Sequence, residues 1–468
     1  MLCRTFPSFL HIKSIQKCPR INIKRLFSSK GLVDELDSRG MIFQATNRSD
    51  IAKRLERKSA IYLGIDPTAK SLHVGHLLPL MCLLHFFLRG HEVIPLIGGA
   101  TGLVGDPSGK MEERTPLGKE KAVDNVESLT RAVDGFFASA AEYGSKRSRS
   151  SQNHEPGSLP KVANNAEWLA SLGLLEFLTK AGRHARVPTM ISRDSVKIRM
   201  SSQQGISFTE FAYQLLQAYD FYHLYNTRQC TLQLGGSDQW GNILSGVDLI
   251  DRTRKKEDPV AHGLTTPLLT TASGAKFGKS EGNAVWLDRG LTSVLDFYQF
   301  FLRTADADVG KYLHMFTLLS TEDIADIIQK HESAPEKRMA QRVLAEEVVE
   351  LIHGGEAVSR ARIATQALFE TSLSQLSAHD IVNALEGDPR LVLCPRDEAI
   401  GQPVWKLAGK YALASSNSDA RRLAASKGLY LNNAPVDVQQ TLQETDLIDN
   451  GVAILRAGKD SHLVLALR

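Results

Sequence analysis

The sequence has few cysteines, and no two of them form a C-x-x-C pair. This wide spacing argues against a structural zinc site and against a disulfide framework, so we expect no metal site and a reducing compartment. The sequence also lacks an apolar run of the roughly 18 residues that a membrane span requires, and we expect no membrane partner. The five cysteines are Cys3, Cys18, Cys82, Cys230 and Cys394.

Acidic residues are absent before Asp34. Within 1–30, basic residues are separated by serines and apolar residues, and such a stretch can form an amphipathic helix. This composition is typical of a mitochondrial transit peptide and predicts a protein of the mitochondrial matrix. The alternative is a basic arm that stays attached and binds RNA. The basic residues are Arg4, Lys13, Lys17, Arg20, Lys24, Arg25 and Lys30.

The rest of the chain has no large excess of either charge. The full sequence holds 56 basic and 52 acidic residues, and without the basic residues of 1–30 the balance becomes slightly acidic. Any binding of nucleic acid must therefore come from local basic patches. The 468 residues, 43% of them hydrophobic, are enough for two or three domains with large cores.

Two histidines lie where a predicted strand leads into a predicted helix. The run 60–65 predicts the strand and 77–88 predicts the helix, with His73 and His76 just before it. A helix N-terminus offers free N–H groups and partial positive charge, which suit a phosphate, and Gly75 lets a flat ligand approach the backbone. Two ordinary histidines at a helix start would give the same pattern.

Glycine-rich segments follow two further predicted strands. Strand 91–97 runs into Gly98-Gly99-Ala100-Thr101-Gly102, with Asp106 just beyond. Strand 229–234 runs into Gly235-Gly236-Ser237-Asp238-Gln239. Strands that alternate with helices predict a parallel sheet, and such sheets bind ligands beyond the carboxyl ends of their strands.

Two other stretches bring polar groups together. The loop Lys276-Phe277-Gly278-Lys279-Ser280 carries two lysines and a serine that suit a polyphosphate, although an exposed loop without function can look similar. In the predicted helix 208–220, Tyr213, Gln217 and Asp220 follow at spacings of four and three and share one face. They form either the wall of a polar pocket or a buried hydrogen-bonded network.

Changes of pattern along the chain indicate several domains. Helices are expected over 121–143 and 166–186, with a disordered polar loop at about 144–160 between them. Near the end, a helix at 418–426 gives way to short strands at 429–431 and 452–455. We therefore expect a transit peptide at 1–30, a parallel-sheet domain at 31–290, an α-helical domain at 291–385 and a small α+β domain at 398–468.

These motifs, in this order, resemble those of the bacterial-type tyrosyl-tRNA synthetases, which are class I aminoacyl-tRNA synthetases. His73-Val74-Gly75-His76 and Lys276-Phe277-Gly278-Lys279-Ser280 look like the two class I signatures. The resemblance implies an α/β fold: a Rossmann-type parallel-sheet catalytic domain, an α-helical anticodon-binding domain, and a small α+β RNA-binding domain similar to a ribosomal protein. The other segments that resemble the family are Tyr62, Asp66-Pro67-Thr68, 98–106, 208–220 and 235–240.

The resemblance implies a two-step reaction. The carboxylate of tyrosine attacks the α-phosphate of ATP and releases pyrophosphate, and the tyrosyl adenylate then esterifies the terminal ribose of tRNA(Tyr). Such chemistry needs positioning and charge stabilisation rather than a protein nucleophile. We expect ATP with magnesium as substrate, no tightly bound cofactor, and a homodimer. Together with the transit peptide, the resemblance implies a role in mitochondrial translation.

The resemblance also implies a role for individual residues. Tyr62 and Asp220 would bind the phenolic hydroxyl of tyrosine, and Gln239 would lie near its carboxylate. The ammonium group would contact Asp106, Tyr213 and Gln217, with Asp66 at the same end of the site. Catalysis at the ATP phosphates would fall to Thr68, His73 and His76, and to a mobile loop with Lys276, Lys279 and Ser280, assisted by Lys110 and Arg114. ATP would also contact Gly75, Gly236 and Asp238, and tRNA would contact Arg421, Arg422 and Lys427.

Some features depart from the family, and other interpretations remain open. Leu63 stands where some members have a cysteine that touches the ribose, and the loop at 144–160 is longer than a minimal enzyme needs. A tryptophanyl-tRNA synthetase is the nearest rival, although Tyr62 and Asp220 argue against it. The other rival is an RNA-binding protein, for example one that helps group I introns to fold. The basic residues of the tail could also form an ordinary solvated face.

Overall fold

A computed structural model describes most of the chain, and the described residues fold into a pair of compact units. The first unit ends at Gly355, and the second runs from Glu356 to Arg468. No helix among the described residues is long and apolar enough to cross a membrane. The described residues are 31–108, 118–147, 158–203, 205–272, 274, 277, 279–280, 283–370, 373, 376–459 and 461–468.

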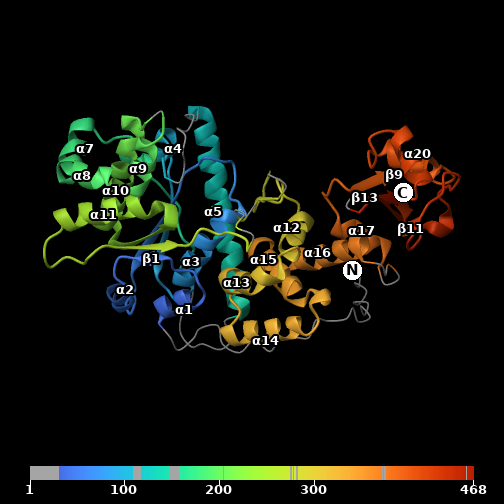
Figure 1. The fold of residues 1–468 in the computed structure, drawn as a ribbon, viewed down its shortest axis with the longest axis horizontal. Coiled ribbons are helices and arrows are strands. Elements are labelled where there is room, and N and C mark those ends of the chain that lie inside the picture. The colour runs from blue at the N-terminus through green and yellow to red at the C-terminus, as the bar shows by residue number, and fades with distance from the viewer. Residues whose placement is uncertain are drawn as a thin grey trace, which may run out of the picture. The chain divides into compact units, whose positions relative to one another are not determined.

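The first unit is built on a six-stranded sheet with the order β1-β6-β5-β2-β3-β4 (Figure 1). Only the edge strand β1 is antiparallel to its neighbour. From β2 the chain adds β3 and β4 on one side, and it later adds β5 and β6 on the other, so the order reverses between β2 and β5. Ligands of such sheets bind beyond the carboxyl ends of the strands at this reversal. The strands are β1 Gln44–Ala45, β2 Ala60–Ile65, β3 Glu92–Ile97, β4 Ala163–Asn164, β5 Cys230–Gly236 and β6 His262–Thr266.

Helices cover both faces of this sheet (Figure 1). Helices α10 (Phe208–Arg228) and α11 (Trp240–Thr253) pack on each other and on β5, and Tyr62 of β2 meets Phe221 of α10 at a ring distance of 5.3 Å. Helices α3 (Leu77–Leu88) and α5 (Lys119–Arg147) pack against the other face. Shorter helices of this unit are α1 Leu32–Ser38, α2 Arg48–Arg54, η1 Val74–His76, α4 Thr101–Val104, α6 Ala166–Leu169, α7 Leu174–Lys180, η2 Gly182–His184, α8 Val187–Ile191, α9 Asp194–Met200 and η3 Ser237–Gln239.

Helices also make up the remainder of the first unit. Helices α12 to α15 follow the sheet domain, and a short hairpin of β7 and β8 precedes them. Helix α15 packs on α12, α13 and α5. The elements are β7 Lys279–Ser280, β8 Asn283–Ala284, α12 Val294–Leu302, α13 Asp306–Phe316, α14 Thr321–Glu332, η4 Pro335–Lys337 and α15 Met339–His353.

The second unit contains a five-stranded mixed sheet with the order β11-β10-β12-β13-β9. Strands β13 and β9 are parallel, and the other pairs are antiparallel. Since it begins at Glu356, this unit includes some of the helical stretch expected at 291–385, and the domain boundaries stay a prediction. Its elements are α16 Gly355–Phe369, α17 Ala378–Ala384, β9 Leu391–Cys394, α18 Arg396–Ala399, α19 Val404–Lys410, α20 Asn417–Ala425, β10 Leu429–Leu431, β11 Ala434–Pro435, η5 Glu444–Asp446, β12 Val452–Ala457 and β13 Ser461–Leu467.

The α/β fold with a parallel sheet, a helical region and a small mixed sheet confirms the predicted fold class. Two local predictions are wrong. A loop is expected from about residue 144, but α5 continues to Arg147, whose guanidinium is held by Glu347 and Glu350 of α15. The helix expected over 166–186 is broken into α6, α7 and η2, because Gly173 has an extended backbone and begins a new helix as its N-cap.

Candidate active site

Asp66, just after β2, connects three elements at the point where the strand order reverses. The Tyr213 hydroxyl of α10 donates a hydrogen bond of 2.6 Å to one carboxylate oxygen of Asp66. The Thr101 hydroxyl of α4 donates one of 2.8 Å to the other. A β-carbon on Gly98 would lie 2.0 Å from this carboxylate. A glycine is therefore needed at 98 for Asp66 to occupy this position.

Asp220 lies at the opposite end of the same network. The indole N–H of Trp168 donates to its Oδ1 at 2.8 Å, and the Asn165 amide donates to its Oδ2 at 2.9 Å. Asn165 also donates to Thr101 at 2.9 Å. Burial raises the pKa of the Asp220 carboxyl to about 7, and the two donors oppose that shift. The carboxyl group is thus fixed in position and is only partly ionised at neutral pH.

Tyr62 reaches the same region from β2 with an unsatisfied hydroxyl. Its side chain is fully buried, and the hydroxyl oxygen has no hydrogen-bond partner among the described residues. Burial raises the pKa of this phenol well above its ordinary value, and the nearby Asp220 raises it further. An unpaired buried hydroxyl costs about 1–3 kcal/mol. A ligand with its own hydroxyl at this end of the pocket would remove that cost.

A second polar cluster gathers around Asp106. Gln239 of η3 donates to Asp106 Oδ2 at 2.7 Å, and the backbone N–H of Ser108 donates to Oδ1 at 3.0 Å. The amide of Asn242, on α11, donates to Gln217 Oε1 at 3.0 Å and lies 3.3 Å from Asp106 Oδ1. The structure therefore brings together three predicted site residues that come from different elements.

Tyr213 links the two clusters electrostatically. Burial raises the pKa of its phenol well above the ordinary value, and the charges of Asp66, Asp106 and Asp220 raise it further. Three acidic side chains thus surround one buried tyrosine, and their negative charge suits a cationic group such as an ammonium ion.

The two histidines lie side by side at the start of α3. Their rings are 4.0 Å apart; His73 Nδ1 accepts from the backbone N–H of Gly75 at 3.0 Å, and His76 Nδ1 accepts from the backbone N–H of His73 at 3.2 Å. Desolvation and the neighbouring His73 lower the pKa of His76 to about 3. A neutral His76 can then offer its other ring nitrogen as a donor. A β-carbon on Gly75 would lie 2.7 Å from the His73 ring, so glycine is required there.

The segment after the lysine-rich loop runs beside these histidines. The backbone N–H of Val74 donates to Val285 at 2.9 Å, and that of Leu287 donates to Leu72 at 2.9 Å. Between these two hydrogen bonds, His73 and Trp286 pair as an isolated antiparallel β-bridge. The two predicted phosphate-binding segments are therefore neighbours. Lys110, Arg114 and Lys276 lie outside the described residues, and for Lys279 and Ser280 the structure describes only their backbone in β7.

The other predicted contacts for a nucleotide lie at the same edge of the sheet. Thr68 is exposed in the turn after β2, and Gly236 is the last residue of β5. Asp238 lies in η3 and accepts a 3.3 Å hydrogen bond from Gln239. Among the described residues, no group of three or more His, Cys, Asp or Glu side chains could hold a metal ion.

Sequence reasoning missed four residues of this site: Thr101, Asn165, Trp168 and Asn242. Asn165 and Trp168 follow the two-residue strand β4, which is too short to give an alternating pattern. Thr101 lies in a segment recognised as a ligand-binding loop, and Asn242 lies in α11 just after another, but nothing in the sequence distinguishes them from their neighbours. All four are identified only in the folded structure, where each donates a hydrogen bond to an acidic side chain.

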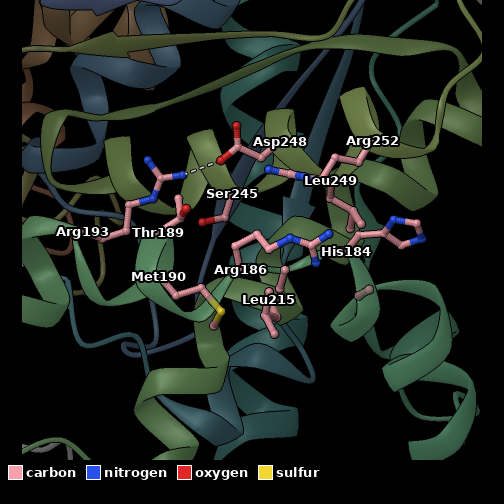
Figure 2. A pocket seen from close by; sticks show the side chains of 12 residues that line it. His184, Arg186, Thr189, Met190, Arg193, Leu215, Ser245, Asp248, Leu249 and Arg252 are labelled. Atoms are coloured by element: carbon pink, nitrogen blue, oxygen red, sulfur yellow. Dashed lines mark hydrogen bonds and ion pairs between the residues drawn. The ribbon is translucent and has the colours of Figure 1, made fainter.

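A separate cavity lies between η2, α8, α10 and α11 (Figure 2). It contains none of the predicted site residues, although it shares α10 and α11 with the site. Figure 2 shows Arg186, Arg193 and Arg252 around the same space, and Arg193 donates to Asp248 at 2.7 Å. Neighbouring arginines suit phosphate groups. The full lining is Ala181, His184, Ala185, Arg186, Thr189, Met190, Arg193, Leu215, Ser245, Asp248, Leu249 and Arg252.

The predicted tRNA contacts lie in the second unit, on and just after α20. The Arg421 guanidinium is 5.8 Å from the Trp405 ring, and Arg422 pairs with Asp419 at 2.6 Å. Lys427 adopts a left-handed backbone, with φ of 56°, in the turn before β10. The three cationic side chains thus lie close together in the sequence, on α20 and in the turn that follows it.

Comparisons with known proteins show the family to which the chain is similar. The family model of "tRNA synthetases class I (W and Y)" matches residues 53–370. A tyrosine–tRNA ligase of Roseiflexus castenholzii is 44% identical, over 93% of this chain and 99% of that protein. A mitochondrial tyrosine–tRNA ligase of Saccharomyces cerevisiae is 39% identical, over 94% of this chain and 89% of that protein. The crystal structure of a C-terminally truncated mitochondrial tyrosyl-tRNA synthetase of Aspergillus nidulans is similar with a TM-score of 0.66 and 38% identity, covering 73% of this chain and 94% of that one.

Proposed function

Since the chain belongs to the bacterial-type tyrosine–tRNA ligases, class I aminoacyl-tRNA synthetases, we propose that it charges tRNA(Tyr) for mitochondrial translation with the residues described above. In the first step a carboxylate oxygen of tyrosine bonds to the α-phosphorus of Mg·ATP, and pyrophosphate leaves. In the second step a terminal ribose hydroxyl of tRNA(Tyr) bonds to the tyrosyl carbonyl, and AMP leaves.

The observation that carries the tyrosine pocket is the buried, unpaired Tyr62 hydroxyl beside Asp220. We propose that the phenolic hydroxyl of the substrate binds between these two groups. The substrate ammonium then lies near Asp66, Asp106 and Tyr213, where three carboxylates favour a cation. Gln217 completes this end with its amide, and Gln239 lies near the substrate carboxylate. Phenylalanine would leave Tyr62 and Asp220 unpaired and is therefore rejected.

The ATP phosphates are proposed to lie over the start of α3. There His73 and His76 offer ring nitrogens, Gly75 offers an exposed backbone, and Thr68 is exposed nearby. The loop with Lys276, Lys279 and Ser280 would neutralise the leaving pyrophosphate. Gly236 and Asp238 would contact the adenosine. The hydrogen bonds from Val74 to Val285 and from Leu287 to Leu72 support this arrangement, because they join the segment that follows the second signature to the first signature.

The direct test is tyrosine-dependent exchange of pyrophosphate into ATP by purified residues 31–468. Tyrosine, phenylalanine, tryptophan and no amino acid are compared. We expect exchange with tyrosine alone. Exchange with tryptophan would overturn the assignment of the phenol pocket, and no exchange at all would overturn the proposed catalytic roles.

For tRNA, we propose that Arg421, Arg422 and Lys427 contact the phosphate backbone, and that Arg186 and Arg252, which line the separate cavity, do the same. Replacing Arg421 and Arg422 together by glutamine should raise the KM for tRNA(Tyr) and reduce the salt dependence of its binding. Pyrophosphate exchange should not change. An unaltered salt dependence would mean that these arginines belong to a solvated face.

A homodimer is proposed because large apolar side chains are exposed along consecutive helices of the first unit. Phe208 is 80% exposed at the start of α10, and Leu175 of α7 is 81% exposed. Phe208→Asp should convert the dimer to monomers in analytical ultracentrifugation. Val123→Asp, at a 58% exposed position of α5, is the matched control and should leave the dimer intact. A dimer that survives Phe208→Asp would place the interface elsewhere.

The mitochondrial location is proposed from the basic, acid-free residues 1–30. The match to the Roseiflexus protein covers 99% of that protein but 93% of this chain, so this chain has residues that the bacterial one lacks. Residues 1–30 fused to a reporter should be imported into isolated mitochondria and cleaved. The same fusion with all seven basic residues changed to glutamine should stay outside. Import of both fusions, or of neither, would contradict a transit peptide.

A further inference from the structure

The turn that precedes the second signature is tied to helix α13. The carboxylate of Asp308 accepts a 2.9 Å hydrogen bond from the backbone N–H of Ala272. The carbonyl of Thr270 accepts from the Tyr312 hydroxyl and from the Lys311 ammonium, each at 3.4 Å. Asp308 is 5% exposed, whereas Ala272 is exposed, so their hydrogen bond is partly buried. Three residues within two turns of one helix thus hold Thr270 and Ala272 of this turn.

The same turn is closed at its base and anchored by an aromatic side chain. The backbone N–H of Phe277 donates to Leu269 at 3.0 Å. The Phe277 ring is buried against Tyr312, at 4.6 Å, and stacks on Phe316 at 5.6 Å with an angle of 18°. Phe277 stands two residues before Lys279, where β7 begins. The Phe277 side chain is therefore positioned by α13, together with Phe300 and Phe301 of α12.

We propose that Asp308 and Tyr312 are positioning residues for adenylate formation. Tyr312 packs against the Phe277 ring and Asp308 holds Ala272 of the same turn. Together they would set the position of β7, which lies beside the segment that pairs with His73. Neither residue is assigned a contact with a substrate. The inference rests on the proposed function, because it requires that the second signature act on the ATP phosphates. Groups that act only when charge develops on the phosphates stabilise the transition state. Displacing them should therefore lower kcat more than it weakens the binding of substrates.

The test compares Asp308→Ala with Asp308→Asn and with a neighbouring control. Asp306, on the same helix, accepts from Gln341 and pairs with His331 at 3.0 Å, away from the turn. We expect Asp308→Ala to lower kcat for pyrophosphate exchange about tenfold, the loss of one hydrogen bond to a charged group. The KM for tyrosine should not change. Asp308→Asn, whose amide oxygen can still accept from Ala272, should recover most of the activity.

Several outcomes would overturn the proposal. Asp306→Asn lowering kcat as much as Asp308→Ala would mean that α13 acts only through stability. The same conclusion would follow if Asp308→Ala changed the unfolding temperature and left kcat intact. Tyr312→Phe is a second test variant. It removes the hydroxyl that donates to Thr270 but keeps the ring against Phe277. We expect it to lower kcat with little loss of stability. If the unmodified protein exchanges no pyrophosphate with tyrosine, the proposed function has failed independently of these variants.

Discussion

The backbone N–H of Val74 donates a 2.9 Å hydrogen bond to the carbonyl of Val285. Val74 lies between the two histidines of the first signature, and Val285 follows β8, five residues after Ser280. Segments that lie far apart in the chain are thereby joined through their backbones, so side-chain substitutions need not disturb the join. This contact is the physical reason to expect that both signatures act on one substrate.

Replacing His76 by alanine should strongly reduce adenylate formation. The ring supplies a donor at the proposed phosphate site, and loss of one such group typically costs about 100-fold or more in kcat. Tyrosine-dependent pyrophosphate exchange measures this loss, and binding of tRNA(Tyr) should stay unchanged. His379→Ala, at an exposed position of the second unit, is the control. An unchanged exchange rate in the His76 variant would refute the proposed role.

Tyr62→Phe should weaken the selection of tyrosine over phenylalanine without lowering the stability of the fold. Without substrate, the variant should unfold at the same temperature or higher, because the hydroxyl it loses is buried and unpaired. The KM for tyrosine should rise about tenfold with the loss of one hydrogen bond, and rejection of phenylalanine should weaken. Tyr225→Phe, which removes a 2.6 Å hydrogen bond to Pro259 outside the pocket, should leave both kinetic values intact. A stability loss with unaltered specificity at Tyr62 would contradict the pocket.

Tyrosine binding should weaken as the pH falls through about 7. Burial raises the pKa of Asp220 to about 7, and the ionised carboxylate is the form that accepts a hydrogen bond from the substrate phenol. The ionised fraction falls about tenfold between pH 8 and pH 6 for such a pKa. The KM for tyrosine should therefore rise about tenfold over this range, and Asp220→Asn should abolish that dependence. An inflection near pH 4 instead would mean that Asp220 has an ordinary pKa in the working enzyme.

Arg147→Ala should destabilise the first unit far more than Lys146→Ala. The buried Arg147 guanidinium contacts Glu347 at 2.7 Å and Glu350 at 2.8 Å. Its loss leaves Glu347 without a cation, and Glu350 keeps only a 3.6 Å contact with Lys146. Breaking such a pair costs about 3–5 kcal/mol. The half-exposed Lys146 pairs with Glu142 at 2.7 Å and more distantly with Glu350 at 3.6 Å, and its removal should cost below about 1 kcal/mol. Urea unfolding of both variants measures the difference, and equal midpoints would show that Arg147 does not hold α5 to α15.

Much of the fold was predictable because its elements carry strong local signals. The strand over 60–65 and the helix over 77–88 are confirmed at the same residues. The expected start of the helix near Ser207 is confirmed by a capping box between Ser207 and Glu210. Prediction failed where a distant contact decides the local structure. The last turn of α5 persists because of α15, and the two-residue strand β4 exists because β3 pairs with it.

The sequence by itself determined the family, the parallel sheet and the loops that hold the polar residues, because periodicity and short motifs are local properties of the chain. Only the tertiary structure decided which polar groups meet. In the folded structure Asp66 accepts a hydrogen bond from Tyr213, and Asp220 accepts hydrogen bonds from Asn165 and Trp168. The Tyr62 hydroxyl has no partner among the described residues. Such pairings depend on how strands and helices pack across the fold, and no spacing along one segment encodes them.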